Sequence, residues 1–139
     1  MTDADRATLT KELIRDEGIR TYPYRDTVGK LTIGVGRNLD DNGISVEEAH
    51  VLLAHDVKDV IEEMAHHFPW AAQMSGARQR VLANMIFNLG TPKLLRFKNT
   101  LAAMSSGQYQ KAADGMRASK WASQVGDRAE RLATLMEQG

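Results

Sequence analysis

Two carboxylates and one hydroxyl lie in a glycine-rich stretch from residue 16 to residue 37. They belong to Glu17, Asp26 and Thr32. Glycoside hydrolysis needs one protonated acid, which donates to the leaving oxygen, and one ionised carboxylate on the far side of the sugar ring. The two acids could supply this chemistry if the fold places them on opposite walls of one groove.

The elements around Gly18 decide how the two acids are presented. The pattern predicts a helix over residues 3–17 with Gly18 as its left-handed stop, so Glu17 lies on the last turn, where the helix macrodipole disfavours a charged carboxylate. Asp26 lies on a polar loop between basic residues, which favours its ionised form. Nine extended residues would hold the two acids roughly 30 Å apart, so the chain has to double back. These environments assign the proton to Glu17 and the charge to Asp26.

A β-hairpin is predicted after this helix, because the period of the pattern changes from 3.6 to 2. Its second strand covers residues 30–35. One face of that strand carries three apolar side chains that require a core, namely Leu31, Ile33 and Val35. Thr32 then lies on the other face, which Gly34 and Gly36 leave clear.

The rest of the chain is predicted to be helical. A capping box over residues 45–48 opens a long helix that runs to about His67, and helical spacing returns from Ser75. At 139 residues the chain is one domain in stability terms. We expect that domain, residues 1–139, to contain a β lobe over 18–44, a connecting helix over 45–68, and a helical lobe over 69–139 that packs with helix 3–17.

The net charge is zero but is divided unevenly along the chain. Residues up to Trp70 include 8 basic and 14 acidic side chains, and residues from Ala71 onward include 10 basic and 4 acidic side chains. We expect the basic half to meet an acidic partner, for which the carboxylate-bearing peptides of bacterial cell wall are the first candidate. Nucleic acid is the competing partner, but no nucleic-acid motif supports it.

The residue types and the spacing of Glu17, Asp26 and Thr32 match those of a known family. Glu17 is followed by Gly18, Asp26 comes nine residues after the Glu, and Thr32 comes six residues later within Thr-Ile-Gly-Val-Gly. This arrangement resembles the catalytic signature of the T-even phage lysozymes, glycoside hydrolase family 24. The resemblance continues through residues 84–90, 97–101, 119–121 and 127–131. It implies an α+β, lysozyme-like fold in which a small β-hairpin lobe and a larger all-helical lobe are joined by a long helix, with a cleft between them.

The resemblance implies a peptidoglycan hydrolase that cleaves the β-1,4 bond between N-acetylmuramic acid and N-acetylglucosamine. Glu17 would be the general acid, while Asp26 and Thr32 would position the attacking water, and no cofactor or metal is needed. Inversion requires carboxyl groups roughly 6.5 to 9.5 Å apart. Two alternatives are a lytic transglycosylase, which needs no water-directing carboxylate, and an inactive wall-binding module.

Further residues match the family's site positions. Four match substrate contacts: Phe87, Asn88, Thr100 and Asn38. The structural alternative for Phe87 is a core side chain, and for Asn88 it is a helix cap. Arg128 matches an arginine near the catalytic Glu, where a cation would favour the charged carboxylate. Arg37 replaces a His that commonly pairs with an Asp matched here by Asp56, so we expect an Arg37–Asp56 ion pair, with an unpaired surface Arg as the alternative.

The remaining expectations concern structural residues, partners and location. Trp70 and Trp121 are expected to be structural, since a lone Trp in a helical lobe is more often part of the core. His50 and His55 are five apart, off the spacing of a helical zinc pair, so no metal site is expected. We expect a monomer without stable membrane association. In the absence of a signal peptide or transmembrane segment, it should stay in the host cytoplasm until released to the wall, and the resemblance implies a pore-forming holin as the partner for delivery.

Overall fold

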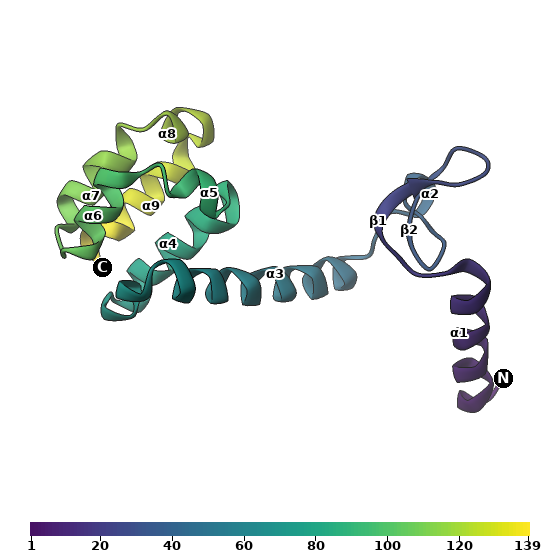
Figure 1. Ribbon diagram of the computed structural model, residues 1–139. Helices are drawn as coiled ribbons and strands as arrows, with labels where there is room; N and C mark the ends of the chain where they lie inside the picture. The colour runs from purple at the N-terminus through teal and green to yellow at the C-terminus, as the bar shows by residue number, and fades with distance from the viewer. The chain divides into compact units, whose positions relative to one another are not determined.

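The computed structural model describes all 139 residues, which form two compact units, Met1–Val51 and Leu52–Gly139 (Figure 1). Each unit is described in its own terms. The first contains one long helix and a small antiparallel sheet, and the second contains only helices. This composition agrees with the predicted α+β class. No helix combines the length and the apolarity that crossing a bilayer requires.

The first helix of the first unit, α1 (Asp3–Glu17), has the predicted bounds. Thr2 caps it through a reciprocal capping box with Asp5, which satisfies two of the N–H groups that a helix start leaves unpaired. At the other end the Gly18 N–H donates to the Ile14 carbonyl oxygen at 2.8 Å, with a φ of 75° that favours glycine. Glu17 is therefore the last helical residue.

Three strands follow in the order β1 (Arg20–Arg25), β2 (Leu31–Gly34) and β3 (Arg37–Asn38), each antiparallel to its neighbour. The predicted hairpin is confirmed by β1 and β2, which pair from Arg25–Leu31 to Arg20–Gly34 with an irregularity in between. After β3, Asn38 caps a one-turn helix, α2 (Leu39–Asn42), by accepting from the Asp41 N–H.

The predicted burial of β2 is wrong within this unit. Thr32 is 3% exposed, whereas Leu31 and Ile33 are half-buried and Val35 is 39% exposed. The physical reason within this unit is that its three strands form a single sheet, and the unit contains no second sheet to pack on it. Thr32 lies in the central strand, paired with Tyr24 on one side and Asn38 on the other.

The long helix α3 (Val46–His67) begins and ends as predicted. Its capping box is present, because Ser45 Oγ accepts from the Glu48 N–H and Glu48 Oε1 accepts from the Ser45 N–H. The boundary between the two units falls inside it, after Val51.

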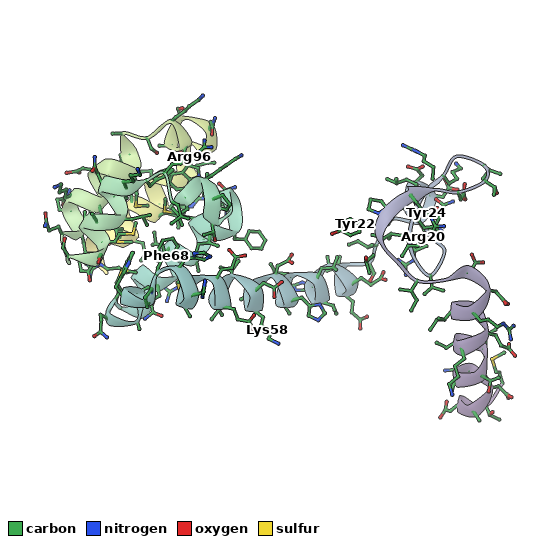
Figure 2. The ribbon with its side chains drawn as sticks, in the orientation of Figure 1. Arg20, Tyr22, Tyr24, Lys58, Phe68 and Arg96 are labelled. Atoms are coloured by element: carbon green, nitrogen blue, oxygen red, sulfur yellow. The ribbon has the colours of Figure 1, made fainter.

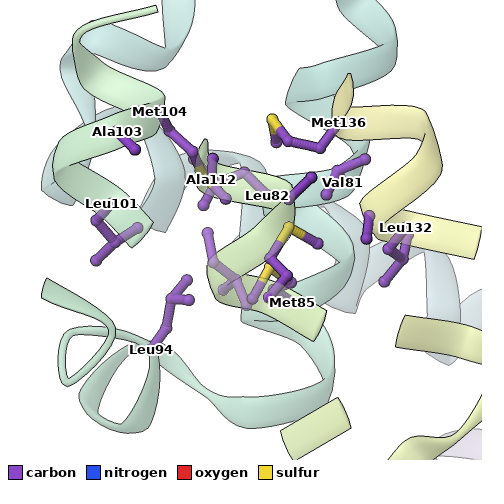
Figure 3. Close-up of a cluster of buried hydrophobic side chains, with 14 of the residues drawn as sticks. Val81, Leu82, Met85, Leu94, Leu101, Ala103, Met104, Ala112, Leu132 and Met136 are labelled. Carbon is purple, nitrogen blue, oxygen red and sulfur yellow. The ribbon is translucent and has the colours of Figure 1, made fainter. Parts of the chain in front are cut away.

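The second unit builds the hydrophobic core, part of which is shown in Figure 3. Its elements after α3 are η1 (Pro69–Gln73), α4 (Gly76–Leu89), α5 (Thr91–Leu94), α6 (Lys98–Ser105), α7 (Tyr109–Arg117), α8 (Lys120–Val125) and α9 (Asp127–Gln138). α7 packs against α6 and α9. The inward face of α4 carries the buried side chains of Val81, Leu82, Met85 and Ile86. Trp121 is also buried, and Trp70 packs on the core, which confirms that both are structural.

Candidate active site

Glu17 projects from the end of α1 toward the turn that joins β2 to β3. A Cβ built on Gly36 would lie 3.0 Å from Glu17 Oε2, so the carboxylate rests directly against this glycine. Glu17 is otherwise exposed to solvent. The space left by the missing side chain of Gly36 is therefore occupied by the carboxylate of Glu17.

Asp26 is fixed by the hairpin loop that contains it. Its Oδ1 accepts from the backbone N–H groups of Val28, at 3.0 Å, and Lys30, at 2.8 Å. This is the local bonding by which an Asp stabilises a turn. Oδ2 accepts no hydrogen bond from the protein, so one oxygen anchors the carboxylate while the other is available for a ligand.

Thr32 is tied to the backbone of the same residue as Asp26, namely Lys30. Its hydroxyl donates to the Lys30 carbonyl oxygen at 2.8 Å, while the Lys30 N–H donates to Asp26 Oδ1. The Asp26 N–H also donates to the Lys30 carbonyl, at 2.9 Å. Since its only hydrogen is committed to Lys30, the Thr32 hydroxyl can offer a lone pair and can only accept from a further group.

The geometry thus joins the predicted residues in one unit. Asp26 and Thr32 share Lys30 as a common anchor, and Glu17 lies against the turn that follows β2. Chemically, the arrangement offers an exposed acid at Glu17, a carboxylate oxygen of Asp26 that accepts no hydrogen bond, and a hydroxyl lone pair at Thr32. These are the groups that acid-assisted attack by water on a glycosidic carbon needs.

If Glu17 is the general acid, as predicted, Gly36→Ala should reduce the expected hydrolysis of cell wall about tenfold, because the new methyl group would displace the Glu17 carboxylate and a misplaced catalytic group loses rate steeply. Gly34→Ala is the matched control. Both glycines have a positive φ, 69° at Gly34 and 68° at Gly36, but a Cβ at Gly34 would meet nothing within 4 Å. Rates of wall hydrolysis and thermal unfolding should show similar destabilisation in both variants and a large rate loss only in Gly36→Ala. Equal rate losses would show that backbone strain, and not contact with Glu17, is responsible.

Arg37 pairs with Glu48, not with the predicted Asp56. Its two terminal nitrogens donate to the two Glu48 oxygens at 2.9 and 2.8 Å, and Nη1 also donates to the Gly43 carbonyl. Asp56 lies eight residues further along α3, roughly 12 Å along a helix, so an Arg held bidentately by Glu48 is not free for it. The pair joins β3 to the first turn of α3.

The Arg37–Glu48 pair should make thermal stability depend on acid pH. The hydrogen bonds that Glu48 accepts from Arg37 and Ser45 lower the pKa of Glu48 from 4.5 to about 2. A depressed carboxyl pKa gives stability that is complete above the unfolded pKa and is lost as the pH falls through the folded one. We expect Glu48→Gln to melt below wild type at pH 6, and the gap to close between about pH 4.5 and 2.

The neighbouring Glu47→Gln is the control for this measurement, since Glu47 is exposed and has no ion-pair partner. Its melting temperature should follow wild type throughout. A gap between Glu48→Gln and wild type that stays constant down to pH 2 would contradict the assigned role of the ion pair.

The other predicted residues, apart from Asn38, lie in the second unit. Arg128 donates from Nε and Nη2 to Asn84 Oδ1, at 3.0 and 2.7 Å. Phe87 is 48% exposed and lines an apolar groove of about 500 Å³ together with Arg128 and Asn84. Sequence reasoning missed Asn84, which directly precedes the apolar core residue Met85 and carried no signal of its own. The roles of Phe87 and Arg128 at the substrate stay predictions.

Three of the residues predicted to contact substrate also have structural roles within the protein. Asn88 Oδ1 accepts from Trp121 Nε1 at 2.8 Å, and Asn38 uses both ends of its amide on Asp41. Thr100 is buried, and a Cβ on Gly115 would collide with its hydroxyl. Their contacts with substrate also stay predictions.

Comparison with known proteins places this geometry in context. Residues 15–138 match the model of the family described as phage lysozyme. The pre-baseplate central spike protein Gp5 of Enterobacteria phage T4 is 30% identical, with 99% of this chain and 29% of Gp5 covered. A probable T4-type lysozyme 2 of Dictyostelium discoideum is 25% identical, and the match covers 96% of this chain and 95% of that protein. The peptidoglycan hydrolase gp36 of Pseudomonas phage phiKMV is 28% identical, and the match covers 98% of this chain and 16% of gp36. The chain therefore spans less than a third of these two phage proteins.

Proposed function

Because this chain belongs to the phage lysozyme family, we propose that it is a glycosidase that hydrolyses peptidoglycan at the β-1,4 bond between N-acetylmuramic acid and N-acetylglucosamine. The relatives named as lysozyme and peptidoglycan hydrolase support a cell-wall hydrolase. One observation carries the proposal to this chain's own residues. Asp26 and Thr32 are anchored on the backbone of the same residue, Lys30, with one carboxylate oxygen and one hydroxyl lone pair free.

Glu17 is the general acid of the proposed reaction. Its protonated carboxyl group gives its proton to the glycosidic oxygen as the bond to the anomeric carbon breaks, so the leaving sugar departs as an alcohol. Gly36 supplies the space in which that carboxyl group lies. The reaction leaves Glu17 ionised.

Asp26 and Thr32 direct the water in the second half of the reaction. One water hydrogen points to Asp26 Oδ2, which takes that proton as the water oxygen bonds to the anomeric carbon, and the other points to the Thr32 lone pair. The proton on Asp26 then returns to Glu17 through solvent, which restores both groups. Attack from the face opposite the leaving group inverts the anomeric centre. No cofactor takes part in these steps.

The competing activities leave different products. After digestion of purified wall and borohydride reduction, mass spectrometry should find reduced N-acetylmuramic acid at the new ends. Anhydro-muramic ends would assign the chain to the lytic transglycosylases, and reduced N-acetylglucosamine ends would move the cleaved bond. An absence of soluble products with retained binding to wall would leave a binding module. Each of these three outcomes contradicts the proposal.

The wider setting of the enzyme is also part of the proposal. We expect a monomeric chain that acts on peptidoglycan after release from the cytoplasm, with a holin as the partner that delivers it. The organisation of residues 1–139 as one domain, with helix 3–17 packed on the helical lobe, stays a prediction.

A further inference from the structure

The one-turn helix α2 is attached to the hairpin loop that carries Asp26, although the proposed reaction uses none of its side chains. The helix packs against β2 and contributes two neighbouring acids, Asp40 and Asp41. Both acids bond to residues at the end of the loop that joins β1 to β2. The strand before this loop is the one whose Tyr24 is labelled in Figure 2.

Asp40 extends the support of β2 beyond the end of β3. The pairing of β2 with β3 ends at Thr32 and Asn38. Asp40 Oδ2 accepts from the Leu31 N–H at 2.7 Å, so its carboxylate takes up the next residue of β2 toward the loop. A carboxylate that accepts from a backbone N–H forms a stronger hydrogen bond than a neutral acceptor does. Leu31 is thereby held between Lys30 and Thr32.

Two cations of the hairpin add to this attachment. Arg25 Nη1 donates to the Gly29 carbonyl oxygen at 3.1 Å and lies 3.5 Å from Asp40 Oδ2. Lys30 Nζ donates to Asp41 Oδ1 at 2.9 Å. Both ion pairs are exposed, so solvent and salt weaken them. The hydrogen bond from the backbone to Asp40 therefore contributes more, because its donor is already fixed in a strand.

These attachments bear on the site because Lys30 anchors both groups that direct the water. The Lys30 N–H donates to Asp26 Oδ1 and the Lys30 carbonyl accepts from the Thr32 hydroxyl, at 2.8 Å in each case. A displacement of the Lys30 backbone would therefore move Asp26 and Thr32 together. The bond from Leu31 to Asp40 opposes that displacement at the next residue, and catalytic rates are sensitive to shifts of about 1 Å.

We propose that Asp40 is a positioning residue of the hydrolase. By accepting from the Leu31 N–H, it holds the Lys30 backbone and so keeps Asp26 and Thr32 in the geometry that directs the water. Asp40 acts through these groups and takes no part in proton transfer. This inference rests on the proposed function and deepens it, since it adds a residue that the reaction needs for geometry alone.

Three single variants separate positioning from general stability. Asp40→Ala removes the acceptor, whereas Asp40→Asn keeps an amide oxygen that can accept from the Leu31 N–H. Asn42→Ala is the matched control, because Asn42 lies in the same helical turn and its side chain is exposed and bonds to no group of the loop.

The first measurement is of kcat and KM on soluble wall fragments. We expect Asp40→Ala to lower kcat about tenfold with KM within about twofold of wild type, because the water is engaged only in the transition state. Asp40→Asn should recover kcat to within about threefold of wild type, since it restores the hydrogen bond. Asn42→Ala should match wild type in both constants.

Amide hydrogen exchange, followed by NMR, measures the positioning independently of activity. The Lys30 N–H reports the anchor of the Asp26 carboxylate, and the Gly18 N–H at the end of α1 reports the rest of the unit. In Asp40→Ala the exchange of the Lys30 N–H should be about fivefold faster or more, while that of Gly18 stays as in wild type. Asp40→Asn and Asn42→Ala should leave both amides close to wild type.

Several results would overturn the proposal. They are a wild-type kcat in Asp40→Ala, a loss that appears in KM alone, an equal loss of kcat in Asp40→Asn or Asn42→Ala, and exchange that quickens as much at Gly18 as at Lys30. If wild type cleaves none of the fragments, the proposed function fails and the exchange measurement decides the positioning role. Faster Lys30 exchange in Asp40→Ala with recovery in Asp40→Asn would support that role, and unchanged exchange would refute it.

Discussion

Glu17→Gln should lower the rate of wall hydrolysis by about a thousandfold or more, because an amide cannot donate the proton that the leaving oxygen needs. The glutamine has the same shape, so it fits against Gly36 as the native acid does. Its thermal unfolding should match wild type, since the Glu17 carboxylate makes no ion pair that the change would break. Clearing of a purified wall suspension at equal protein concentration is the measurement.

Glu12→Gln is the control for the loss of charge on α1. Glu12 is exposed on the same helix and has no ion-pair partner. Clearing by this variant should equal that of wild type. If Glu17→Gln cleared the suspension as fast as Glu12→Gln does, Glu17 would not be the acid.

Asp26→Asn should lower the rate about a hundredfold to a thousandfold, because the amide cannot take the proton of the attacking water. The fold should survive, since the amide oxygen of Asn can accept from the Val28 and Lys30 N–H groups as Oδ1 does. The same clearing assay measures the effect, with kcat and KM determined separately on soluble fragments. We expect the loss in kcat, because the water is engaged only in the transition state.

Asp3→Asn provides the comparison for Asp26→Asn, since Asp3 is exposed in the first turn of α1. Its kcat and KM should equal those of wild type. A loss in Asp26→Asn that appeared only in KM would assign Asp26 to substrate binding and remove it from the chemical step.

The elements that carry the site could be predicted because local rules decide them. Gly18 ends α1, which fixes Glu17 on the last turn, and the change of period after it predicts the hairpin that carries Asp26 and Thr32. The capping box at Ser45 likewise fixed the start of α3. In each case the determining residues lie within a few positions of the feature.

What could not be predicted depends on groups that are distant in sequence or on which atoms bond. Arg37 was assigned to Asp56 by family position, but its geometry selects Glu48, whose carboxylate the capping box already orients toward Ser45. The burial of Thr32 was missed because alternation places apolar residues inward, whereas this sheet has only one layer. Pattern alone also did not predict that Asp26 and Thr32 share Lys30 as their anchor.

The division of labour between Glu17 and the Asp26–Thr32 pair is tested most directly by the stereochemistry of the first product. Proton NMR of a digest of soluble wall fragments, recorded before mutarotation, reports the configuration of the new reducing end. Attack by a water held at Asp26 and Thr32 predicts the α-anomer as the first product. An initial β-anomer would make Asp26 a covalent nucleophile, and an anhydro end would remove water from the reaction; either result would contradict the mechanism.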